Sequence, residues 1–143
     1  MSDQQLPAEW PASVHPPGAE SFGQTAVVWL FDQVPADYRL HGVLRRHPVA
    51  LSRLARIHVA SCLEGARRGY RTARVELRDH LPPHALDQVM NAYLDEGKRT
   101  AALLRQVEAV DAALRAQAAE GGEGGEGTAE GVSGGDGGAE VSR

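Results

Sequence analysis

Apolar and small residues recur at helical spacing in the segment that follows Pro48. They occur every three or four positions, at Leu51, Ala55, Val59, Cys62, Ala66, Tyr70, Ala73 and Leu77. This is the period of one face of an α-helix. Pro48 suits the first position of a helix, because its missing N–H would be unpaired there anyway. The pattern predicts a helix over residues 48–79, roughly 46 Å long.

A second apolar stripe follows Pro82 and Pro83, which end the first helix but are able to start another. Its members are Leu86, Met90, Tyr93, Gly97, Thr100, Leu104, Val107 and Leu114. The stripe predicts a helix over residues 83–118. Two long helices joined by a short proline-containing turn form an antiparallel hairpin, so we predict an all-α protein built on one.

Both stripes are wider than one partner helix can cover, so a further element must pack on the hairpin. Residues 29–38 read WLFDQVPADY and hold three of the seven aromatic residues. We predict that Trp29, Phe31 and Tyr38 pack across one end of the hairpin as a lid. The alternative is that these rings form an exposed patch that docks another protein, because aromatic residues are enriched in interface cores. Both hold if two hairpins associate into a four-helix dimer.

The two ends of the chain differ in composition from the middle. Residues 1–26 carry four of the eight prolines and show little periodicity; we predict an irregular or disordered segment. Residues 119–143 are rich in Gly and Glu, with few apolar side chains to offset the entropy of ordering. We predict a disordered acidic tail there, which leaves residues 27–118 as the helical domain.

Charge is distributed unevenly along the chain. Ten arginines and five acids give residues 27–80 a net charge of +5, whereas residues 81–143 carry −6. In the predicted hairpin, facing residue numbers sum to about 163 if the turn is centred near residue 81 or 82. We therefore predict pairing of opposite charges across the hairpin: Arg67 with Glu96, Arg68 with Asp95, Glu64 with Arg99, Arg56 with Glu108, and Arg53 with Asp111.

Four arginines share one face of the first helix. Arg67, Arg71, Arg74 and Arg78 follow the i, i+4, i+7, i+11 rule. Besides charge pairing, such a row suits contact with the phosphates of a nucleic acid. Arg71, Arg74 and Arg78 have the fewest obvious partners, so these are the best candidates for an anionic ligand.

The sequence offers little catalytic or metal-binding chemistry. Cys62 is the only cysteine and lies on the apolar stripe, so we predict a small buried hydrophobe, with His58 beside it as a hydrogen-bonded core residue. Pro82 and Pro83 separate His80 from His84, which argues against a metal site. No GxSxG, HExxH or CxxC motif occurs. We expect no catalytic residue, metal or cofactor.

Three glycines inside the predicted helices, Gly65, Gly69 and Gly97, each cost about 1 kcal/mol relative to alanine. Either they allow the two backbones to approach closely, or they mark a kink or are simply tolerated.

The run VLRRHPVALSRLARIHV and the later LEGARRGYRTAR are rich in Arg, Ala and Gly. This composition resembles that of small uncharacterised helical proteins of high-GC actinobacteria, over about residues 27–115. The resemblance implies a helical protein and carries no activity, catalytic residue or binding residue.

These observations favour a non-enzymatic module for protein–protein interaction, self-associating as a homodimer. A nucleic-acid-associated regulator that uses the arginine face is the alternative, and a small enzyme or ligand-binding protein with a pocket near His58 and Tyr93 is the third. The chain opens with no basic-then-apolar signal and has no apolar run of 18 residues. With its single cysteine, this predicts a cytoplasmic protein with no membrane association.

Overall fold

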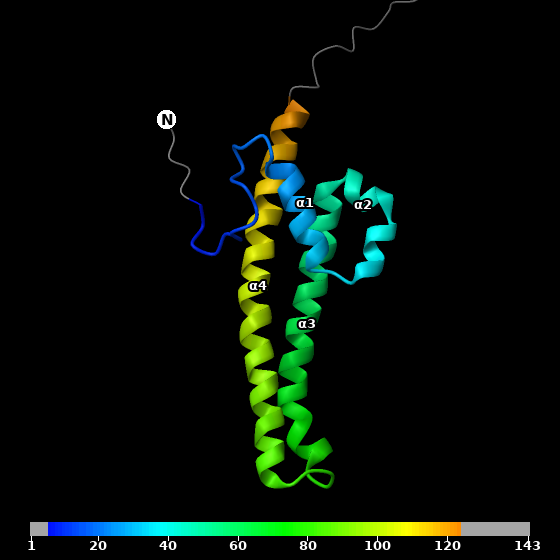
Figure 1. Ribbon diagram of the computed structural model, residues 1–143, viewed down its shortest axis with the longest axis vertical. Coiled ribbons are helices and arrows are strands. Elements are labelled where there is room, and N and C mark those ends of the chain that lie inside the picture. The colour runs from blue at the N-terminus through cyan, green and yellow to red at the C-terminus, as the bar shows by residue number, and fades with distance from the viewer. Residues whose placement is uncertain (1–5, 124–143) are drawn as a thin grey trace, which may run out of the picture.

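The computed structural model describes residues 6–123, and every regular element in that range is a helix. Two long helices, α3 (Pro48–Leu77) and α4 (Pro83–Glu123), pack antiparallel along most of the molecule (Figure 1). Three short helices precede them: α1 (Phe22–Asp32), the 3-10 helix η1 (Ala36–Leu40) and α2 (Gly42–Arg46). The predicted all-α helical hairpin is confirmed.

The ends of α3 and α4 meet at the double proline. Pro48 is in the first turn of α3, as predicted. After Leu77 the chain turns, and the backbone N–H groups of His80 and Leu81 both donate to the Leu77 carbonyl, at 2.9 and 3.1 Å. The Leu86 N–H donates to the Pro82 carbonyl at 3.0 Å, which begins the hydrogen-bonding pattern of α4. Proline at this point ends one helix and starts the next.

The register of the hairpin agrees with the prediction. Ser52 contacts Asp111, Gly69 faces the ring of Tyr93, and Arg74 reaches Asp87. The residue numbers in these pairs sum to 163, 162 and 161, against a predicted value of about 163. The turn therefore lies where the two prolines place it.

The individual charge pairs predicted from that register are wrong. Arg99 binds Glu96 on its own helix at 2.5 Å, and Arg71 binds Glu64 at 3.2 Å along α3. Within residues 6–123 only two ion pairs join α3 to α4: Arg56–Asp111 at 3.8 Å and Arg74–Asp87 at 3.5 Å. Most of the charged side chains point away from the helix interface, where a neighbour along the same helix is nearer than the opposite helix.

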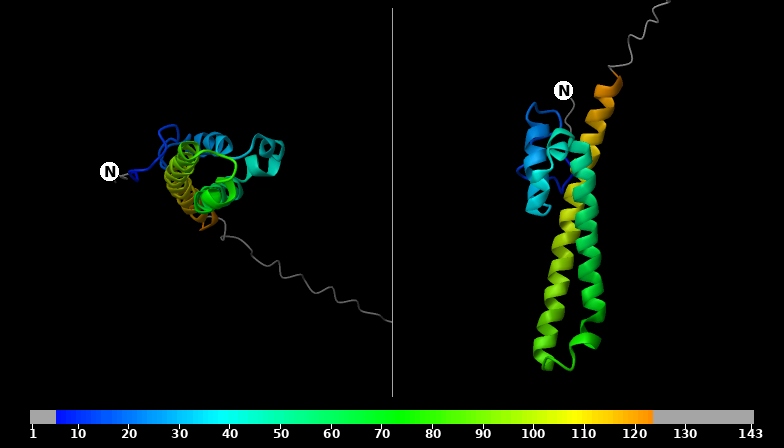
Figure 2. Two further views of the ribbon diagram at one scale, coloured as in Figure 1. Left: turned by 90° about the horizontal axis from the view of Figure 1, so that it is seen from below. Right: turned by 90° about the vertical axis from the view of Figure 1, so that its right-hand side faces the viewer.

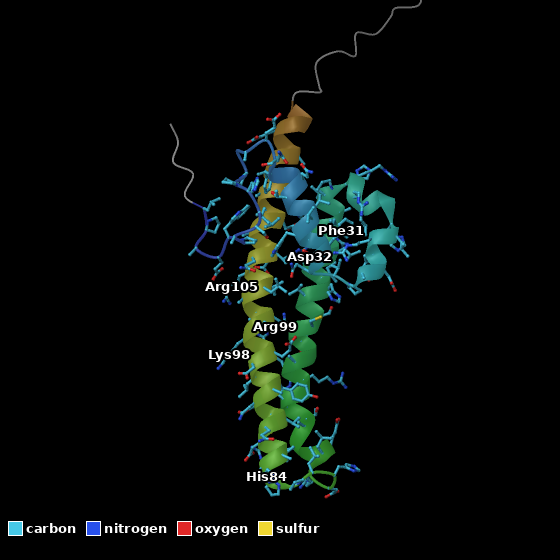
Figure 3. The ribbon with its side chains drawn as sticks, viewed as in Figure 1. Phe31, Asp32, His84, Lys98, Arg99 and Arg105 are labelled. Atoms are coloured by element: carbon cyan, nitrogen blue, oxygen red, sulfur yellow. The ribbon has the colours of Figure 1, made fainter. Side chains whose placement is uncertain are left out.

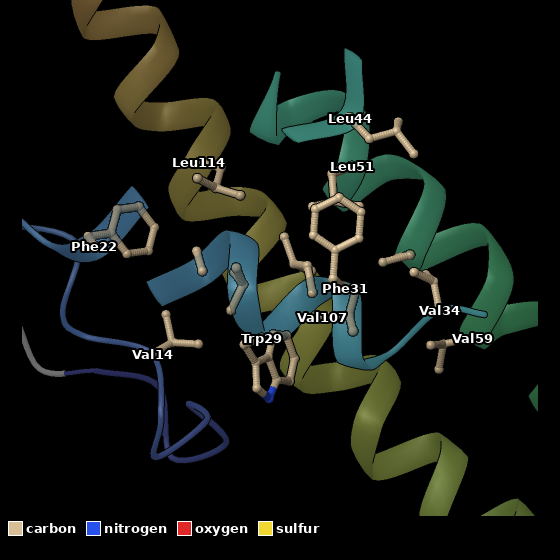
Figure 4. Packing of buried hydrophobic residues seen from close by; sticks show 14 residues of the cluster. Val14, Phe22, Trp29, Phe31, Val34, Leu44, Leu51, Val59, Val107 and Leu114 are labelled. Atoms are coloured by element: carbon tan, nitrogen blue, oxygen red, sulfur yellow. The ribbon is translucent and has the colours of Figure 1, made fainter. Parts of the chain in front are cut away.

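Residues 6–46 form a lid on one end of the hairpin. Trp29 and Phe31 are buried against α3 and α4, and Tyr38 is half-buried beside them, as the lid prediction requires. Figure 4 shows the Phe31 ring close to Leu44 of α2 and Leu51 of α3. The guanidinium of Arg45 lies over the same ring, 5.3 Å from its centre.

The lid begins earlier in the chain than the sequence indicated. Residues 1–26 were expected to be irregular or disordered, but Val14, Phe22 and Ala26 are buried, and α1 starts at Phe22. The rings of Trp10 and Phe22 lie 6.0 Å apart, and the Trp10 indole N–H donates to the Val14 carbonyl at 2.8 Å. Trp10 and Val14 lie among four prolines and produce no helical period, whereas Phe22 and Ala26 begin the helical spacing that Trp29 and Leu30 continue.

At the other end, α4 runs to Glu123, five residues beyond the predicted end at 118. Ala118, Ala119 and Glu120 are strong helix formers, so the helix continues until glycine dominates. The rest of the predicted acidic tail, residues 124–143, lies outside the described residues, as do residues 1–5.

The main apolar core lies under the lid. It joins the lid to the adjoining parts of the long helices through Leu51, Ala55, Val59, Val107, Val110 and Leu114. Figure 2 shows α1, η1 and α2 gathered on one face at one end of the hairpin, while in the described part of the chain the end nearest the turn consists of α3 and α4 alone. We call this second part the free half: residues 63–77 of α3 and 83–98 of α4.

Candidate partner-binding groove

The free half has a thin core of its own. Five of its residues are buried between the helices: Leu63, Ala66, Ala73, Leu86 and Met90. None of them belongs to the core cluster beneath the lid. Two helices cannot enclose much apolar surface between them, so part of the stripe on each helix stays open to solvent.

The open part forms a groove of about 350 Å³ between α3 and α4. Its residues come equally from the two helices: Leu63, Ala66, Arg67, Tyr70 and Arg71 from α3, and Tyr93, Leu94, Gly97, Lys98 and Ala101 from α4. Tyr70 is 38% exposed and Leu94 is 41% exposed. Large apolar side chains this accessible, side by side in a groove, mark a surface suited to binding.

The groove lies on the side of the hairpin opposite the lid. His58 and Cys62 share a surface hollow with Asp32, at the end of α1, and with the residues 33–35 that lead to η1. Arg67 and Arg71 come nine residues after His58 and Cys62, and nine residues are two and a half turns of a helix. The groove residues therefore face away from the lid, and within residues 6–123 no element covers them.

Small residues and two tyrosines shape the floor of the groove. A Cβ atom added to Gly69 would lie 2.2 Å from the Tyr93 ring, so the missing side chain makes room for that ring. Nothing lies within 4 Å of a Cβ added to Gly65 or Gly97. Of the three glycines, only Gly69 provides close packing; Gly97 leaves open space in the groove itself.

The edges of the groove are positively charged. Arg67 and Arg71 border it on α3, and Lys98 borders it on α4. Arg71 is paired with Glu64, whereas neither Arg67 nor Lys98 has an acidic group within 4 Å in the described part of the chain. Figure 3 shows Lys98 and Arg105 projecting from the outer side of α4; Arg105 is bound to Glu9 of the lid at 2.7 Å.

The structure divides the predicted arginine row. Arg67 and Arg71 line the groove, whereas Arg74 and Arg78 continue toward the turn and are exposed. Arg74 pairs with Asp87 at 3.5 Å, and Arg78 has no ion pair among residues 6–123. The first two arginines of the row therefore form one flank of the groove, and the last two extend this flank along α3 toward the turn.

Neither Tyr70 nor Leu94 was predicted as a binding candidate, and Tyr93 was predicted to share a pocket with His58. Tyr70 and Tyr93 were assigned to the buried stripes, and Leu94 to none. The predicted sum of about 163 already places Tyr70 opposite Tyr93, so the two tyrosines were predictable neighbours. Their exposure follows because no described segment forms a lid over this half, and the pattern of either helix does not reveal this.

The rings proposed as a docking patch occupy a different place. Trp29 is 9% exposed and Phe31 is 3% exposed, so neither offers a surface to a partner. Tyr38 is half-buried and lines a shallow hollow of about 420 Å³ with Leu54 and Ile57 of α3. These positions agree with the lid and remove support from docking at Trp29 and Phe31.

Cys62 is exposed, so the prediction that it is buried is wrong. The buried stripe of α3 steps from Val59 to Leu63 and then to Ala66, and Leu63 takes the inward position that the pattern equally allowed for Cys62. His58 is half-buried, and its Nε2 atom lies 3.6 Å from the Cys62 sulfur. His58 is therefore hydrogen-bonded, as expected, but it is not a core residue.

The predicted common pocket near His58 and Tyr93 does not exist in the described structure. His58 lines hollows on the lid side, together with Cys62 or with Tyr38, whereas Tyr93 lines the groove on the opposite side. Arg99 lies on the lid side too, where it donates hydrogen bonds to Glu96 at 2.5 and 3.0 Å. These bonds hold the pKa of the Glu96 carboxyl below its usual value.

Other chemistry is sparse in the described chain. Among residues 6–123, no three His, Cys, Asp or Glu side chains lie close enough together to hold a metal ion. None of the helices in the same range is both long and apolar enough to cross a membrane.

Comparison of the chain with protein-family models, with curated proteins and with solved structures gives no match. The resemblance to helical proteins of actinobacteria therefore stays a prediction.

Proposed function

We propose that the protein is a non-enzymatic interaction module that receives a helix of another protein in the groove of its free half. The observation that carries the proposal is the open apolar floor: Tyr70 and Leu94 are about two-fifths exposed between two helices, and no third element of residues 6–123 lies beside them. In the other half of the hairpin, α1 packs on the opposite face and supplies a third helix.

A helix is the element that fits this surface best. Amphipathic helices commonly bind by laying their apolar face in a hydrophobic groove. Ala66, Gly97 and Ala101 have little or no side chain, so a third helix is able to approach to the 8–10 Å that separates packed helix axes. It would bury Tyr70 and Leu94 and give the free half a three-helix core.

A second copy of the chain suits the groove less well. In a two-fold symmetric dimer the same patch meets itself. Arg67, Arg71 and Lys98 of one copy would then lie near those of the other, and like charges in contact oppose binding. The proposal therefore has two forms: in the stronger form the groove receives a different protein, and in the weaker form it receives a second copy of the chain, as in the expected homodimer.

The proposal is tested with a labelled synthetic peptide of about 18 residues, or ~27 Å of helix, with leucine and alanine on one face and glutamine on the other. Fluorescence anisotropy is expected to show binding that Leu94→Asn weakens severalfold. Val75→Asn is the matched control, because Val75 is 66% exposed on α3 outside the groove. Absence of binding, or equal loss in both variants, would overturn the proposal.

Light scattering on the same samples decides between partners. One chain has a mass of 15.3 kDa. A particle of that mass that binds the peptide supports a separate partner. A particle of twice that mass that Leu94→Asn dissociates identifies a second copy as the occupant, and overturns the stronger form.

A further inference from the structure

Building on the proposed function, we infer that the helix received by the groove is acidic: an amphipathic helix with a narrow apolar seam flanked by carboxylates. The juxtaposition that carries this inference is an apolar floor with basic residues on both edges, Arg67 and Arg71 on α3 and Lys98 on α4.

The basic residues at the edges of the groove differ in whether an acidic side chain already pairs with them. Arg67 and Lys98 have no acidic group within 4 Å among residues 6–123, so a ligand meets them unneutralised. Arg71 is held by Glu64 at 3.2 Å, but both side chains are more than half exposed. An exposed pair of this kind is weak, so a carboxylate of the partner is able to replace Glu64 at little cost.

The flank on α3 extends beyond the groove. Arg74 and Arg78 continue the row set by Arg67 and Arg71, and the four positions span about 16 Å along the helix axis. A helix that lies along the groove and presents acidic residues at i, i+4 and i+7 on one flank would follow this row. A further acidic residue on the other flank would meet Lys98. The apolar seam between these flanks would rest on Tyr70 and Leu94.

The charge pattern separates this partner from other occupants. A nucleic acid would bind the arginine row through its phosphates and would displace Glu64 and Asp87 as a carboxylate does. It would leave Leu94 without an apolar contact. A basic or neutral helix would fill the floor and leave Arg67 and Lys98 unpaired. Only an acidic helix satisfies both the floor and its edges.

The test uses the full chain and three labelled peptides that share one leucine and alanine face and carry Glu, Gln or Lys on the flanks. At low salt the Glu peptide is expected to bind about tenfold more tightly than the Gln peptide, because several exposed ion pairs contribute together. At about 0.5 M salt the difference should fall below about threefold, since screening shortens the reach of exposed charges. The Lys peptide should bind weakest.

Charge-reversal variants locate the effect. Arg67→Glu/Lys98→Glu is expected to abolish the preference for the Glu peptide, and the milder Arg67→Gln/Lys98→Gln to reduce it. Arg53→Glu/Arg68→Glu changes the net charge equally at exposed positions outside the groove, and should keep the preference. Far-ultraviolet circular dichroism establishes that each variant retains its helical fold.

The outcomes separate this inference from the proposed function. Equal binding of the Gln and Glu peptides, with Leu94→Asn still weakening both, overturns the acidic preference and leaves the docking groove intact. Binding of no peptide overturns both. A labelled single-stranded oligonucleotide is the last probe. If it binds the chain while no peptide does, and if Arg67→Glu/Lys98→Glu abolishes that binding, the occupant is a nucleic acid and the inference is overturned.

Discussion

The carboxylate of Asp111 fixes α4 against α3 under the lid, and its removal should measurably destabilise the protein. Asp111 is only 7% exposed. It accepts a hydrogen bond from the fully buried Ser52 hydroxyl at 2.7 Å and one from Arg115 Nε at 3.2 Å. The Nε atom of Arg56 lies 3.8 Å away, too far for a hydrogen bond, and is itself buried with no hydrogen-bond partner among the described residues.

The expected cost of Asp111→Ala follows from these contacts. A hydrogen bond to a charged group contributes about 1.5–3 kcal/mol, and the substitution removes two such bonds. It also leaves Arg56 Nε buried without its nearby counter-charge. The side chains of Arg56 and Arg115 are 38% and 50% exposed, so water compensates part of the loss. We expect the free energy of unfolding to fall by about 2–3 kcal/mol.

Urea denaturation followed by circular dichroism at 222 nm measures this quantity. Glu108→Ala is the control, because Glu108 is an exposed acid on the same helix with no ion pair among residues 6–123. It should change the unfolding free energy by no more than about 0.5 kcal/mol. Glu108 was also the partner predicted for Arg56, so the two variants discriminate directly between the predicted and observed pairs.

A double-mutant cycle tests the assigned contact itself. Ser52→Ala and Asp111→Ala should be non-additive, because each removes the same hydrogen bond. Additive effects, or a change of less than about 0.5 kcal/mol in Asp111→Ala, would refute the reasoning.

Two further predictions concern packing and use the same urea assay. Phe31→Ala should lower the unfolding free energy by about 3–4 kcal/mol because the ring is buried. The control Val28→Ala, at an exposed position of α1, should lower it by less than about 1 kcal/mol. Similar effects of the two substitutions would argue against the lid. Gly65→Ala should stabilise α3 by about 0.5–1 kcal/mol, while Gly69→Ala should destabilise it by about 1 kcal/mol or more through collision with the Tyr93 ring. Adding Tyr93→Ala should remove that collision, and an equal gain from both alanines would contradict it.

The sequence was sufficient to predict the hairpin because the relevant signals are local and strong. The stripe on α3 steps by three as well as by four residues, as from Tyr70 to Ala73 and on to Leu77, and these odd steps select a helix over a strand. The double proline fixes the turn. Once the turn is placed, the register follows by counting, as the contact between Ser52 and Asp111 confirms. Each step depends on covalent geometry or on burial of apolar surface, which dominates the folding energy.

The finer features depend on small differences that a linear pattern does not contain. Cys62 and Leu63 both fit the stripe, and only the packed structure shows that Leu63 turns inward. The choice between Glu96 and Glu64 as the partner of Arg99 involves exposed pairs worth ~0–1 kcal/mol, too little for the register to decide. Phe22 and Val14 were missed because their burial comes from contacts between distant segments.

The uneven placement of the lid connects stability to the proposed binding surface. The large side chains that are buried completely, such as Phe22, Leu30, Leu51 and Val107, all lie in the half that the lid covers. That half supplies most of the apolar burial on which a small domain depends. The free half contributes less, and its glycines and alanines leave a groove where larger residues would have closed the interface. A hairpin that was covered along its whole length would gain core but lose this surface. Anchoring the two long helices at one end therefore allows the other end to keep Tyr70 and Leu94 exposed, as the proposed binding of a partner helix requires.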